Sequence, residues 1–395
     1  MTSSPATPLR VLHVGKYFPP YRGGMETFLR SLMAEQQRQG LEVAALVHNE
    51  ESSFTSRASI YDWKDQSLPV DRVARWATFA FTPVSPSFPF RLARAIKQFA
   101  PDVLHLHMPN VSAFYCLLVP SARSRPWVIH WHSDVPKSKH SVLLRLLYSL
   151  YRIPEQILLK KARRVIATSP PYLASSEPLS SHADRCVVVP LGIEEEPPEE
   201  QFQDRWPAED SRVSNALHVL AVGRLTYYKG FEFLLDAVRL EPRIRLTLVG
   251  DGENCVALQE AVKAKGISER VTFLRECDDA TLQHLFVEAD VLCMSSIERT
   301  EAFGVVLLEA MRSQLPCIVT DVAGSGMRWV VDAPSAGIAI EPENAEALAQ
   351  AFATVLEHPQ TLPRIAKAGS DRFKSHFTID RCGSQIRKVY MDSVT

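Results

Sequence analysis

The sequence predicts an α/β protein built from two doubly wound domains. The chain has 395 residues, more than a single hydrophobic core usually supports. Short apolar runs typical of buried strands alternate with helical stretches in both halves, which predicts parallel sheets covered by helices on both faces. A polar break rich in Glu, Pro, Asp and Gln separates the halves at residues 194–214, and we interpret it as a solvated linker.

The first half begins with an apolar strand at residues 9–15, followed by a loop and by a helix expected to stop at Gly40. Its other expected strands are residues 42–47, 102–107, 127–132, 164–168 and 186–190. The second half has expected strands at residues 217–222, 245–249, 270–274, 291–294 and 317–320, and expected helices at 231–239, 255–265, 281–288 and 304–313.

We therefore predict an N-terminal domain at residues 1–195, a linker at 196–214, a C-terminal domain at 215–375 and a terminal helix at 376–395. Sheets of this kind bind ligands at the carboxyl ends of their strands. A shared cleft between the two domains is the expected binding site, because small ligands favour such interfaces.

Composition argues against several classes of partner and compartment. A formal net charge of -1 argues against nucleic acid as a partner, because a phosphate-tracking surface normally carries a basic excess. The seven cysteines include no C-x-x-C pair, which argues against a disulfide framework or structural zinc and favours the reducing cytoplasm. Residues 1–8 do not resemble a signal peptide, and no apolar run approaches the roughly 20 residues that span a bilayer.

Two loops of the second half have the composition of a phosphate site. Arg224 and Lys229 follow the strand at 217–222 and together can neutralise a diphosphate. Gly250 and Gly252 follow the next strand and permit close approach of the backbone to a ligand. Taken alone, the first loop is more often a surface turn with two solvated cations, and the second is a weak signal.

The segment 301–311 carries the strongest signal. Glu301 and Glu309 are eight residues apart, or roughly 12 Å if the residues between them are helical. Carboxylates so placed can accept hydrogen bonds from the hydroxyls of a sugar and of a ribose, and a helix N-terminus near Gly304 suits a phosphate. The alternative is a helix with one N-terminal acid and one stray buried acid, but a glutamate on an apolar helix is costly unless it is paired.

These residues together resemble the large family 4 of retaining glycosyltransferases, which have the GT-B architecture of two Rossmann-like domains with a cleft between them. Glu301 to Glu309 is similar to its E-x7-E motif. Arg224 and Lys229 match the two cations that hold the donor diphosphate, and the glycine loop of Gly23 and Gly24 matches its N-terminal counterpart. The resemblance covers nearly the whole chain.

The resemblance implies a role for each matching residue. Glu301 would contact hydroxyls of the donor sugar, Glu309 would bind the ribose, and Gly23 and Gly24 would lie near the phosphates and the acceptor. The motif residues Phe303, Gly304 and Val305 are assigned to donor binding as well. The family needs no metal and no other cofactor, and no Asp-x-Asp motif follows a strand here. Transfer with retention by front-face displacement is implied, and the terminal helix would cross back to the first domain.

The motif 131–134 adds His132, which matches a family histidine near the donor sugar, and Asp134, which is placed to bond a sugar or acceptor hydroxyl. A lone histidine is usually a packed side chain, but its place at a strand end favours a function. His105 and His107 alternate on another strand. We expect one of them to face the cleft and neither to bind metal, since no partner of matching spacing is visible.

The residues around the motifs resemble bacterial mannosyl- and rhamnosyltransferases of O-antigen and exopolysaccharide assembly, which implies a GDP-sugar donor and a glycan acceptor. Arg275 stands where the family usually has glycine, so the base stays open, although Glu276 is placed to pair with guanine. The alternatives are a UDP-sugar donor, a GT-B hydrolase or epimerase, and a non-catalytic nucleotide-sugar binder or complex subunit.

A basic segment at residues 137–164 mixes leucines and tyrosines with lysines and arginines. Its apolar residues are read first as packing on the sheet. The positive charges still predict peripheral contact with anionic lipid of the inner membrane, each contributing about 1 kcal/mol. A lipid-linked acceptor would make such contact useful.

Overall fold

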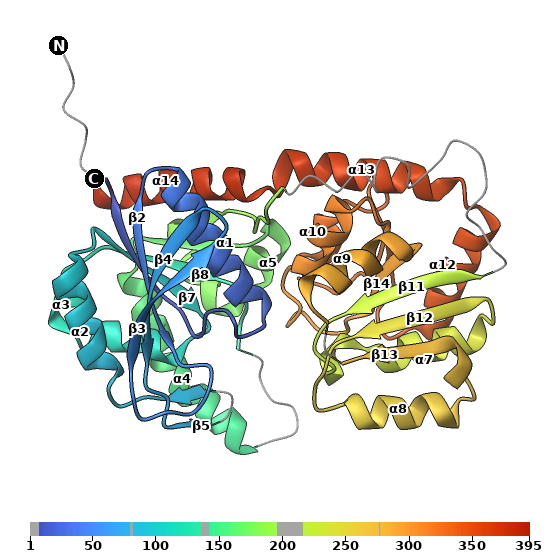
Figure 1. The fold of residues 1–395 in the computed structure, drawn as a ribbon, viewed down its shortest axis with the longest axis horizontal. Coiled ribbons are helices and arrows are strands. Elements are labelled where there is room, and N and C mark those ends of the chain that lie inside the picture. Colours follow the sequence, from blue (N-terminus) through green and yellow to red (C-terminus); the bar gives the residue numbers. More distant parts are fainter. Residues whose placement is uncertain (1–7, 80–81, 136–141, 196–215, 276) are drawn as a thin grey trace, which may run out of the picture. The chain divides into compact units, whose positions relative to one another are not determined.

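The computed structural model describes residues 8–79, 82–135, 142–195, 216–275 and 277–395 (Figure 1). The chain divides into two compact units, one of Met1–Glu194 with Ile379–Thr395 and the other of Glu195–Thr378. The predicted linker at 196–214 lies outside the described residues. No helix in the described ranges is both long and apolar enough to span a membrane.

The first unit contains an eight-stranded sheet of order β10-β9-β8-β7-β1-β2-β4-β3, with β1 near its centre. The strands are β1 (Arg10–Val14), β2 (Glu42–His48), β3 (Arg57–Trp63), β4 (Gln66–Val73), β7 (Val103–Met108), β8 (Trp127–Trp131), β9 (Arg164–Ala167) and β10 (Cys186–Val188). All neighbouring pairs are parallel except β3 with β4, so the sheet ends in an antiparallel edge that the apolar runs do not predict.

The helices of this unit are α1 (Gly24–Arg38), α2 (Phe88–Phe99), α3 (Pro120–Arg123), α4 (Val142–Lys161), α5 (Pro170–Ser175), α6 (Glu177–Ser180) and α14 (Ile379–Val394). A small hairpin of β5 (Ala77–Phe79) and β6 (Thr82–Val84) lies apart from the main sheet. The C-terminal helix α14 packs against α1 and against strands β7 and β8, so the two ends of the chain cover the same sheet (Figure 1).

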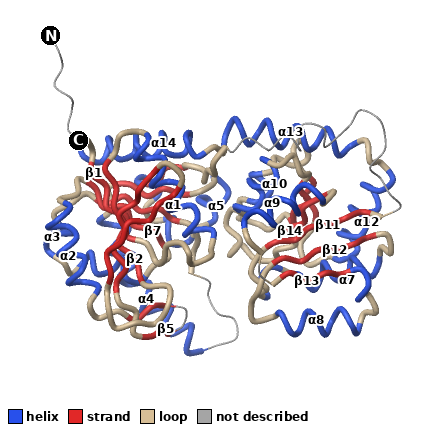
Figure 2. Tube along the Cα trace, viewed as in Figure 1, coloured by secondary structure: helices blue, strands red, loops and turns tan. Residues whose placement is uncertain are grey.

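The second unit has a wholly parallel sheet of order β13-β12-β11-β14-β15-β16 (Figure 2). Its strands are β11 (Leu217–Val222), β12 (Ile244–Val249), β13 (Val271–Leu274), β14 (Val291–Met294), β15 (Cys317–Thr320) and β16 (Ile338–Ile340). Counted within the unit, this is the order 3-2-1-4-5-6 of a Rossmann fold. The chain reverses direction across the sheet between β11 and β14, and ligands of such sheets bind outside the strand ends at this point.

Helices cover both units because the central strands, such as β7, β8, β14 and β15, are buried on both faces. In the second unit they are α7 (Phe231–Leu240), α8 (Cys255–Ala264), α9 (Asp279–Glu288), α10 (Val305–Arg312), α11 (Met327–Val330), α12 (Ala345–Glu357) and α13 (Thr361–His376). One core joins the sheet to α7, α8 and α12, with Val219, Leu234 and Phe352 among its fully buried members. Burying such side chains contributes roughly 1.5–3 kcal/mol each, which explains the continuous apolar runs.

Candidate functional site

The predicted donor-binding residues of the second unit gather at one edge of its sheet. Arg224 and Lys229 follow β11, Gly250 and Gly252 follow β12, and Glu301 follows β14. The strands β11 and β14 are the two that flank the reversal point of the sheet. The structure thus brings the two cations and the first glutamate together where a Rossmann fold binds ligands.

Lys229 and Glu301 form an ion pair with a distance of 2.5 Å between Nζ and Oε2. Both side chains are largely buried, at 10% and 14% exposed. Burial opposes the charged form of Lys229, but the attraction of Glu301 outweighs it and the pKa of the lysine is raised. The lysine is therefore a fixed positive charge held in place by the carboxylate, which also orders the loop after β14.

Arg224 differs from Lys229 in being exposed, and among the described residues its guanidinium forms no salt bridge. The loop after β11 thus carries two different cations. Lys229 is held by Glu301, and Arg224 is available to bind an anion. A guanidinium offers a fork of donors that matches phosphate oxygens.

The glycines after β12 permit a close approach, but in this structure they approach protein. A Cβ at Gly250 would lie 2.0 Å from the carbonyl oxygen of Gly223, and one at Gly252 would lie 2.5 Å from the carbonyl oxygen of Leu225. The backbone N–H of Leu225 also donates to the carbonyl of Asp251 at 3.0 Å. The glycine turn therefore packs against the Arg224 loop and supports it. The sequence alone does not distinguish this role from contact with a ligand.

The residues between Glu301 and Glu309 are only partly helical. Helix α10 starts at Val305, and its N-cap Gly304 has a left-handed backbone with φ of 79°. The condition for a helical rise of roughly 12 Å is therefore not met, because this conformation precedes the helix, which lies within the predicted range of 304–313. Phe303 is buried and contacts Phe377 edge-on, with ring centroids 6.0 Å apart.

Glu309 lies on α10 between buried neighbours and is itself only partly exposed. Desolvation raises its pKa to about 7, and the nearby positive charge of Arg312 opposes the shift. A carboxyl group in this environment can donate as well as accept a hydrogen bond near neutral pH. The predicted contact of Glu309 with the ribose stays a prediction.

Glu276, which is predicted to pair with the base, lies outside the described residues. Its neighbour Arg275, which replaces the glycine usual in the family, pairs with Asp251 at 3.0 Å across the glycine turn. The substitution thus provides a surface ion pair between the loops after β12 and β13.

The glycine loop of the first unit leads directly into a helix. Gly23 is the N-cap of α1, and Gly24 is its first residue. A Cβ at Gly23 would lie 2.2 Å from a carboxylate oxygen of Glu26, which is buried in the first turn. A side chain at Gly23 would therefore require the Glu26 carboxylate to move, and the loop lies at a helix N-terminus.

His132 follows β8 and is only 6% exposed. Its ring stacks on His130 with centroids 4.4 Å apart, and its Nε2 lies 3.0 Å from Nδ1 of His107. Burial lowers the pKa of His132 to about 3, so the ring is neutral. Its predicted catalytic role stays a prediction, and its surroundings are those of a packed and hydrogen-bonded side chain.

His132 belongs to a histidine cluster that sequence spacing does not show. The cluster lies on one face of the adjacent strands β1, β7 and β8, and its members are His13, His105, His107, His130 and His132. His105 and His107 are both buried on this same face, so the expectation that one of them faces a cleft is wrong. Residues two apart on a strand point the same way, and α14 covers them.

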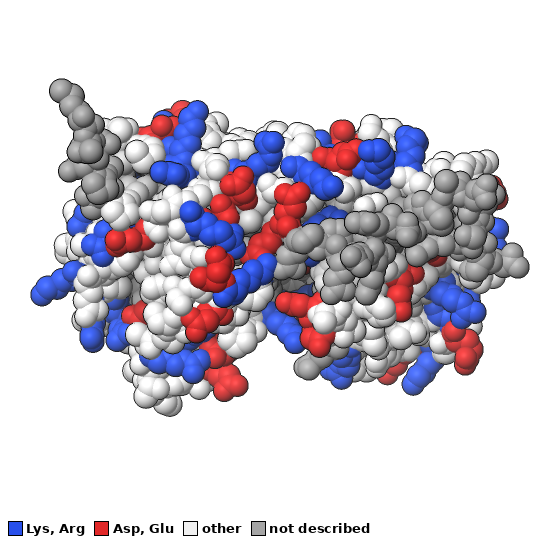
Figure 3. Space-filling model, turned by 45° about the horizontal axis from the view of Figure 1, so that its top comes forward, with Lys and Arg blue, Asp and Glu red and all other residues white. Residues whose placement is uncertain are grey.

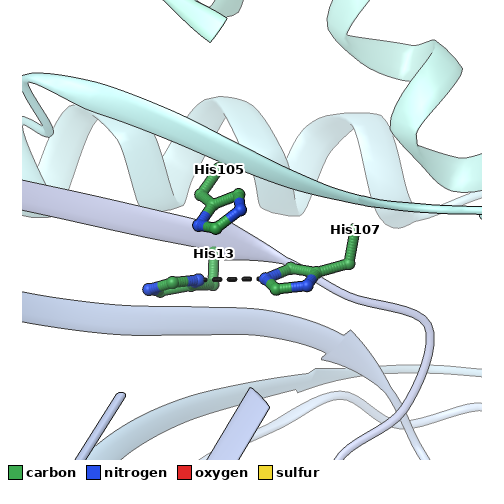
Figure 4. Close-up of side chains that lie close together, drawn as sticks. All are labelled: His13, His105 and His107. Atoms are coloured by element: carbon green, nitrogen blue, oxygen red, sulfur yellow. Dashed lines mark hydrogen bonds between the residues drawn. The ribbon is translucent and has the colours of Figure 1, made fainter. Parts of the chain in front are cut away.

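The reason for excluding metal ligands at His105 and His107 is also corrected. Ring nitrogens of His13, His105 and His107 lie within 4.8 Å of one another, as do those of His107, His130 and His132 (Figure 4). The partners come from neighbouring strands rather than from neighbouring sequence. The spacing could hold a metal ion, although two of the pairs are already hydrogen bonds: Nδ1 of His13 with Nε2 of His107 at 3.1 Å, and Nδ1 of His107 with Nε2 of His132 at 3.0 Å.

Asp134 is held by its neighbours. One carboxylate oxygen accepts from the indole N–H of Trp131 and from the hydroxyl of Ser176, both at 2.7 Å. Its backbone N–H donates to the hydroxyl of Tyr172 at 2.6 Å. These bonds brace the loop that follows β8, and the predicted contact of Asp134 with a sugar or acceptor hydroxyl stays a prediction.

The buried histidines predict a stability that falls with acid. Six in the first unit have lowered pKa values because burial disfavours their charge: His13, His48, His105, His107, His130 and His132. Below pH 6.5 the unfolded chain takes up protons that the folded unit does not, so the free energy of unfolding falls. Each histidine lowers the free energy of unfolding by about 1.4 kcal/mol for each pH unit below 6.5, until the pH reaches its folded-state pKa. Glu155, whose pKa burial raises to about 7, opposes this with a single proton.

We therefore expect urea denaturation midpoints to fall steadily from pH 6.5 to pH 5. For His13, with a folded-state pKa of about 4, the loss continues to near that pH. Midpoints that do not change over this range would show that the cluster is already charged or already open in the folded protein.

Comparison with known proteins adds family information. The family Glycosyl transferases group 1 matches residues 202–372, and the family Glycosyl transferase 4-like domain matches residues 23–192. O-antigen chain mannosyltransferase C of Escherichia coli is similar at 27% identity over 377 residues, which span 94% of this chain and 95% of that protein. GDP-mannose:cellobiosyl-diphosphopolyprenol alpha-mannosyltransferase of Komagataeibacter xylinus is 26% identical over 352 residues, or 85% and 81% of the two chains.

Among solved structures, sucrose-phosphate synthase from Thermosynechococcus elongatus has a similar fold with a TM-score of 0.77 at 20% identity. The match covers 97% of this chain and 98% of that one. It supports the fold alone, because the identity is low.

Proposed function

Because the chain belongs to the group 1 glycosyltransferases and has their GT-B fold, we propose that it transfers a mannose- or rhamnose-type hexose from a GDP-sugar to a saccharide acceptor, with retention and without metal. The family membership carries the reaction class. The observation that carries the site is the buried pair of Lys229 and Glu301 beside the free Arg224, at the reversal point of the second sheet.

The residues of the second unit supply what the proposed reaction requires. The bond between the anomeric carbon and the leaving phosphate oxygen breaks while the acceptor hydroxyl oxygen bonds to the same face of that carbon. The hydroxyl proton passes to the leaving diphosphate. Arg224, Lys229 and the free N–H groups at the start of α10 neutralise that diphosphate, which is the work that a metal ion would otherwise do.

Two carboxyl groups would orient the donor in this scheme. Glu301, already fixed by Lys229, accepts hydrogen bonds from hydroxyls of the transferred sugar. Glu309 binds the ribose, and its raised pKa of about 7 lets the same group donate or accept. Support for a guanosine donor comes from the similarity to an enzyme named for GDP-mannose.

Calorimetric titration of the full chain tests the donor directly. The protein is titrated with GDP, UDP, ADP and their mannose and glucose derivatives in the presence of EDTA. We expect GDP and GDP-mannose to bind and the uridine and adenine nucleotides not to. Preference for UDP would show that the donor is a UDP-sugar rather than a GDP-sugar. A requirement for added Mg²⁺ would refute metal independence. No binding would favour a non-catalytic chain.

We also propose that the acceptor is lipid-linked and that helix α4 contacts the inner membrane. The side chains of Leu150, Ile153 and Ile157 on α4 are 58%, 61% and 44% exposed. Their spacing places them near one face of the helix, and Lys160 and Lys161 follow at its C-terminus. The prediction that the leucines of this segment pack on the sheet is thus wrong for Leu150. Lys137, Lys139 and the side chains of residues 142–147 lie outside what the structure describes.

Replacing Ile153 by aspartate is expected to reduce binding to vesicles that contain anionic lipid, because the change places a charge in the apolar face. The measurement is flotation with vesicles of phosphatidylglycerol and phosphatidylcholine. The control is Val256→Asp, at an apolar residue of α8 that is 65% exposed in the second unit. Equal flotation of the two variants, or none by the wild type, would refute the contact.

A further inference from the structure

A continuous chain of hydrogen bonds runs through the histidine cluster and ends at His132. Oε1 of Gln36 lies 2.8 Å from Nε2 of His13, and Nδ1 of His13 lies 3.1 Å from Nε2 of His107. Nδ1 of His107 in turn lies 3.0 Å from Nε2 of His132. Figure 4 shows the central bond, with His105 placed over the two rings. The two steps after Gln36 each join one ring nitrogen to another, so the position of each proton depends on its neighbours.

Gln36 determines the direction of this chain. Its amide nitrogen donates to the hydroxyl of Tyr390 at 2.8 Å, so its carbonyl oxygen faces His13 and can only accept. His13 must therefore carry its proton on Nε2 and leave Nδ1 bare. His107 then donates from Nε2 to His13, and His132 donates from Nε2 to His107.

Burial keeps this order of protons intact. Gln36 and His13 are fully buried, His107 is 3% exposed and His132 is 6% exposed. A charged ring would carry protons on both nitrogens and would break the order. Desolvation lowers the pKa of each of these histidines, so the rings stay neutral near pH 7.

We infer that Gln36 of α1, acting through His13 and His107, fixes the proton of His132 on Nε2, so that His132 presents a bare Nδ1 as a hydrogen-bond acceptor for a hydroxyl of the bound sugar. Within the described residues this Nδ1 has no hydrogen-bond partner. Gln36 is thus a positioning residue, about two strands away from the group it orients. The order of protons follows from the geometry alone, whereas the sugar contact rests on the proposed function.

The same atoms argue against a metal ion in the cluster. An ion between His13 and His107 needs a bare nitrogen on both rings, whereas the chain places a proton between them. The two arrangements exclude each other, so metal analysis tests the chain of protons. One equivalent of zinc in the purified protein, or tight binding of added zinc, would overturn the inference.

Nuclear magnetic resonance of the full chain labelled with ¹⁵N-histidine tests the proton order without any substrate. Two-bond ¹H–¹⁵N correlations at pH 7 distinguish the two neutral forms of each ring. We expect His13, His107 and His132 all to carry the proton on Nε2. A proton on Nδ1 of His132, which the reverse order of the same chain would require, overturns the inference.

Gln36→Met tests the link to turnover, because methionine keeps the length of the side chain and removes both hydrogen bonds. We expect mixed proton positions on His132 and a fall in kcat of about 10-fold, with donor binding within about 2-fold of wild type. The control is Gln39→Met, one turn along α1, where the amide bonds Glu35 and the backbone of Asp380 instead.

The two readouts separate the inference from the proposed function. Unchanged proton positions in Gln36→Met would show that Gln36 does not set the order. If the proton positions are ordered in the wild type and mixed in Gln36→Met, but kcat is unchanged, the sugar contact at His132 would be overturned. Absence of any transferase activity in the wild type would refute the proposed function and leave the measured proton order standing.

Discussion

Lys229→Ala is expected to lower kcat about 10²–10³-fold, the cost typical of removing one preorganised electrostatic group from an active site. The lysine is buried, permanently charged and fixed by Glu301, so it needs no rearrangement to neutralise a leaving diphosphate. Steady-state kinetics with GDP-mannose and calorimetry with GDP measure the effect. Donor binding is expected to weaken together with turnover, since the charge acts on the diphosphate in both states.

Stability must be separated from activity in this experiment, because the substitution leaves Glu301 without its partner. Loss of one member of a buried ion pair costs roughly 3–5 kcal/mol. The double variant Lys229→Met, Glu301→Gln removes both charges and is expected to regain stability but not activity. Lys265→Ala is the matched control, because Lys265 pairs with Asp236 at 2.5 Å between α7 and the end of α8. Wild-type turnover in Lys229→Ala would refute the assignment of the site.

Glu301→Gln is the second change with a large expected effect, a fall in kcat of about 10²-fold with the affinity for GDP nearly unchanged. The amide keeps the size of the side chain but offers one acceptor oxygen to the sugar and no longer neutralises Lys229. A small displacement of a reacting group has a cost of this order. Comparing GDP with GDP-mannose by calorimetry isolates the sugar, because only the second ligand carries it.

The neighbouring Glu298→Gln is the control for Glu301→Gln. Glu298 lies in the same loop and accepts a hydrogen bond from the hydroxyl of Tyr227 at 2.8 Å. We expect it to retain turnover within a few-fold of wild type. If both variants lose GDP affinity equally, the glutamates act on loop structure rather than on the sugar.

The central strands could be predicted from the sequence because each is apolar on both faces. Strands β11, β14 and β15 begin and end at the predicted residues, and the GT-B fold class is confirmed. The hairpin of β3 and β4 could not be predicted in this way. Its first strand is mostly exposed or half-exposed, and charged residues such as Arg57 and Asp62 interrupt any apolar run. An edge strand of this kind has no buried face to show in the sequence.

The second-unit site was easier to predict than the histidine cluster, for a physical reason. Arg224, Lys229 and Glu301 lie in the loops that follow β11 and β14, so strand prediction alone places them at one edge. The contacts of His13 with His107 depend on the order and register of β1 and β7, which no local pattern contains. Within β7 and at the end of β8 the histidines are two residues apart and therefore point to the same face of the sheet. This alternation was the signal in the sequence that could have revealed the cluster.

The mixed charge of the surface could also be predicted from the sequence. Lysines and arginines are interspersed with acids over the face shown in Figure 3, as the net charge of -1 leads one to expect. This pattern differs from the single-sign surface of a protein that follows a nucleic-acid backbone.

The return of α14 to the first unit has a consequence for synthesis on the ribosome. Tyr390 is fully buried and joins Gln36 with His105, yet it is translated after the whole of residues 195–378. The histidine face of β7 and β8 therefore stays without this cover until residues 379–395 have been synthesised. The first unit begins to form first and is finished last, so a chain truncated before residue 379 loses the cover of a sheet built from its own N-terminal half.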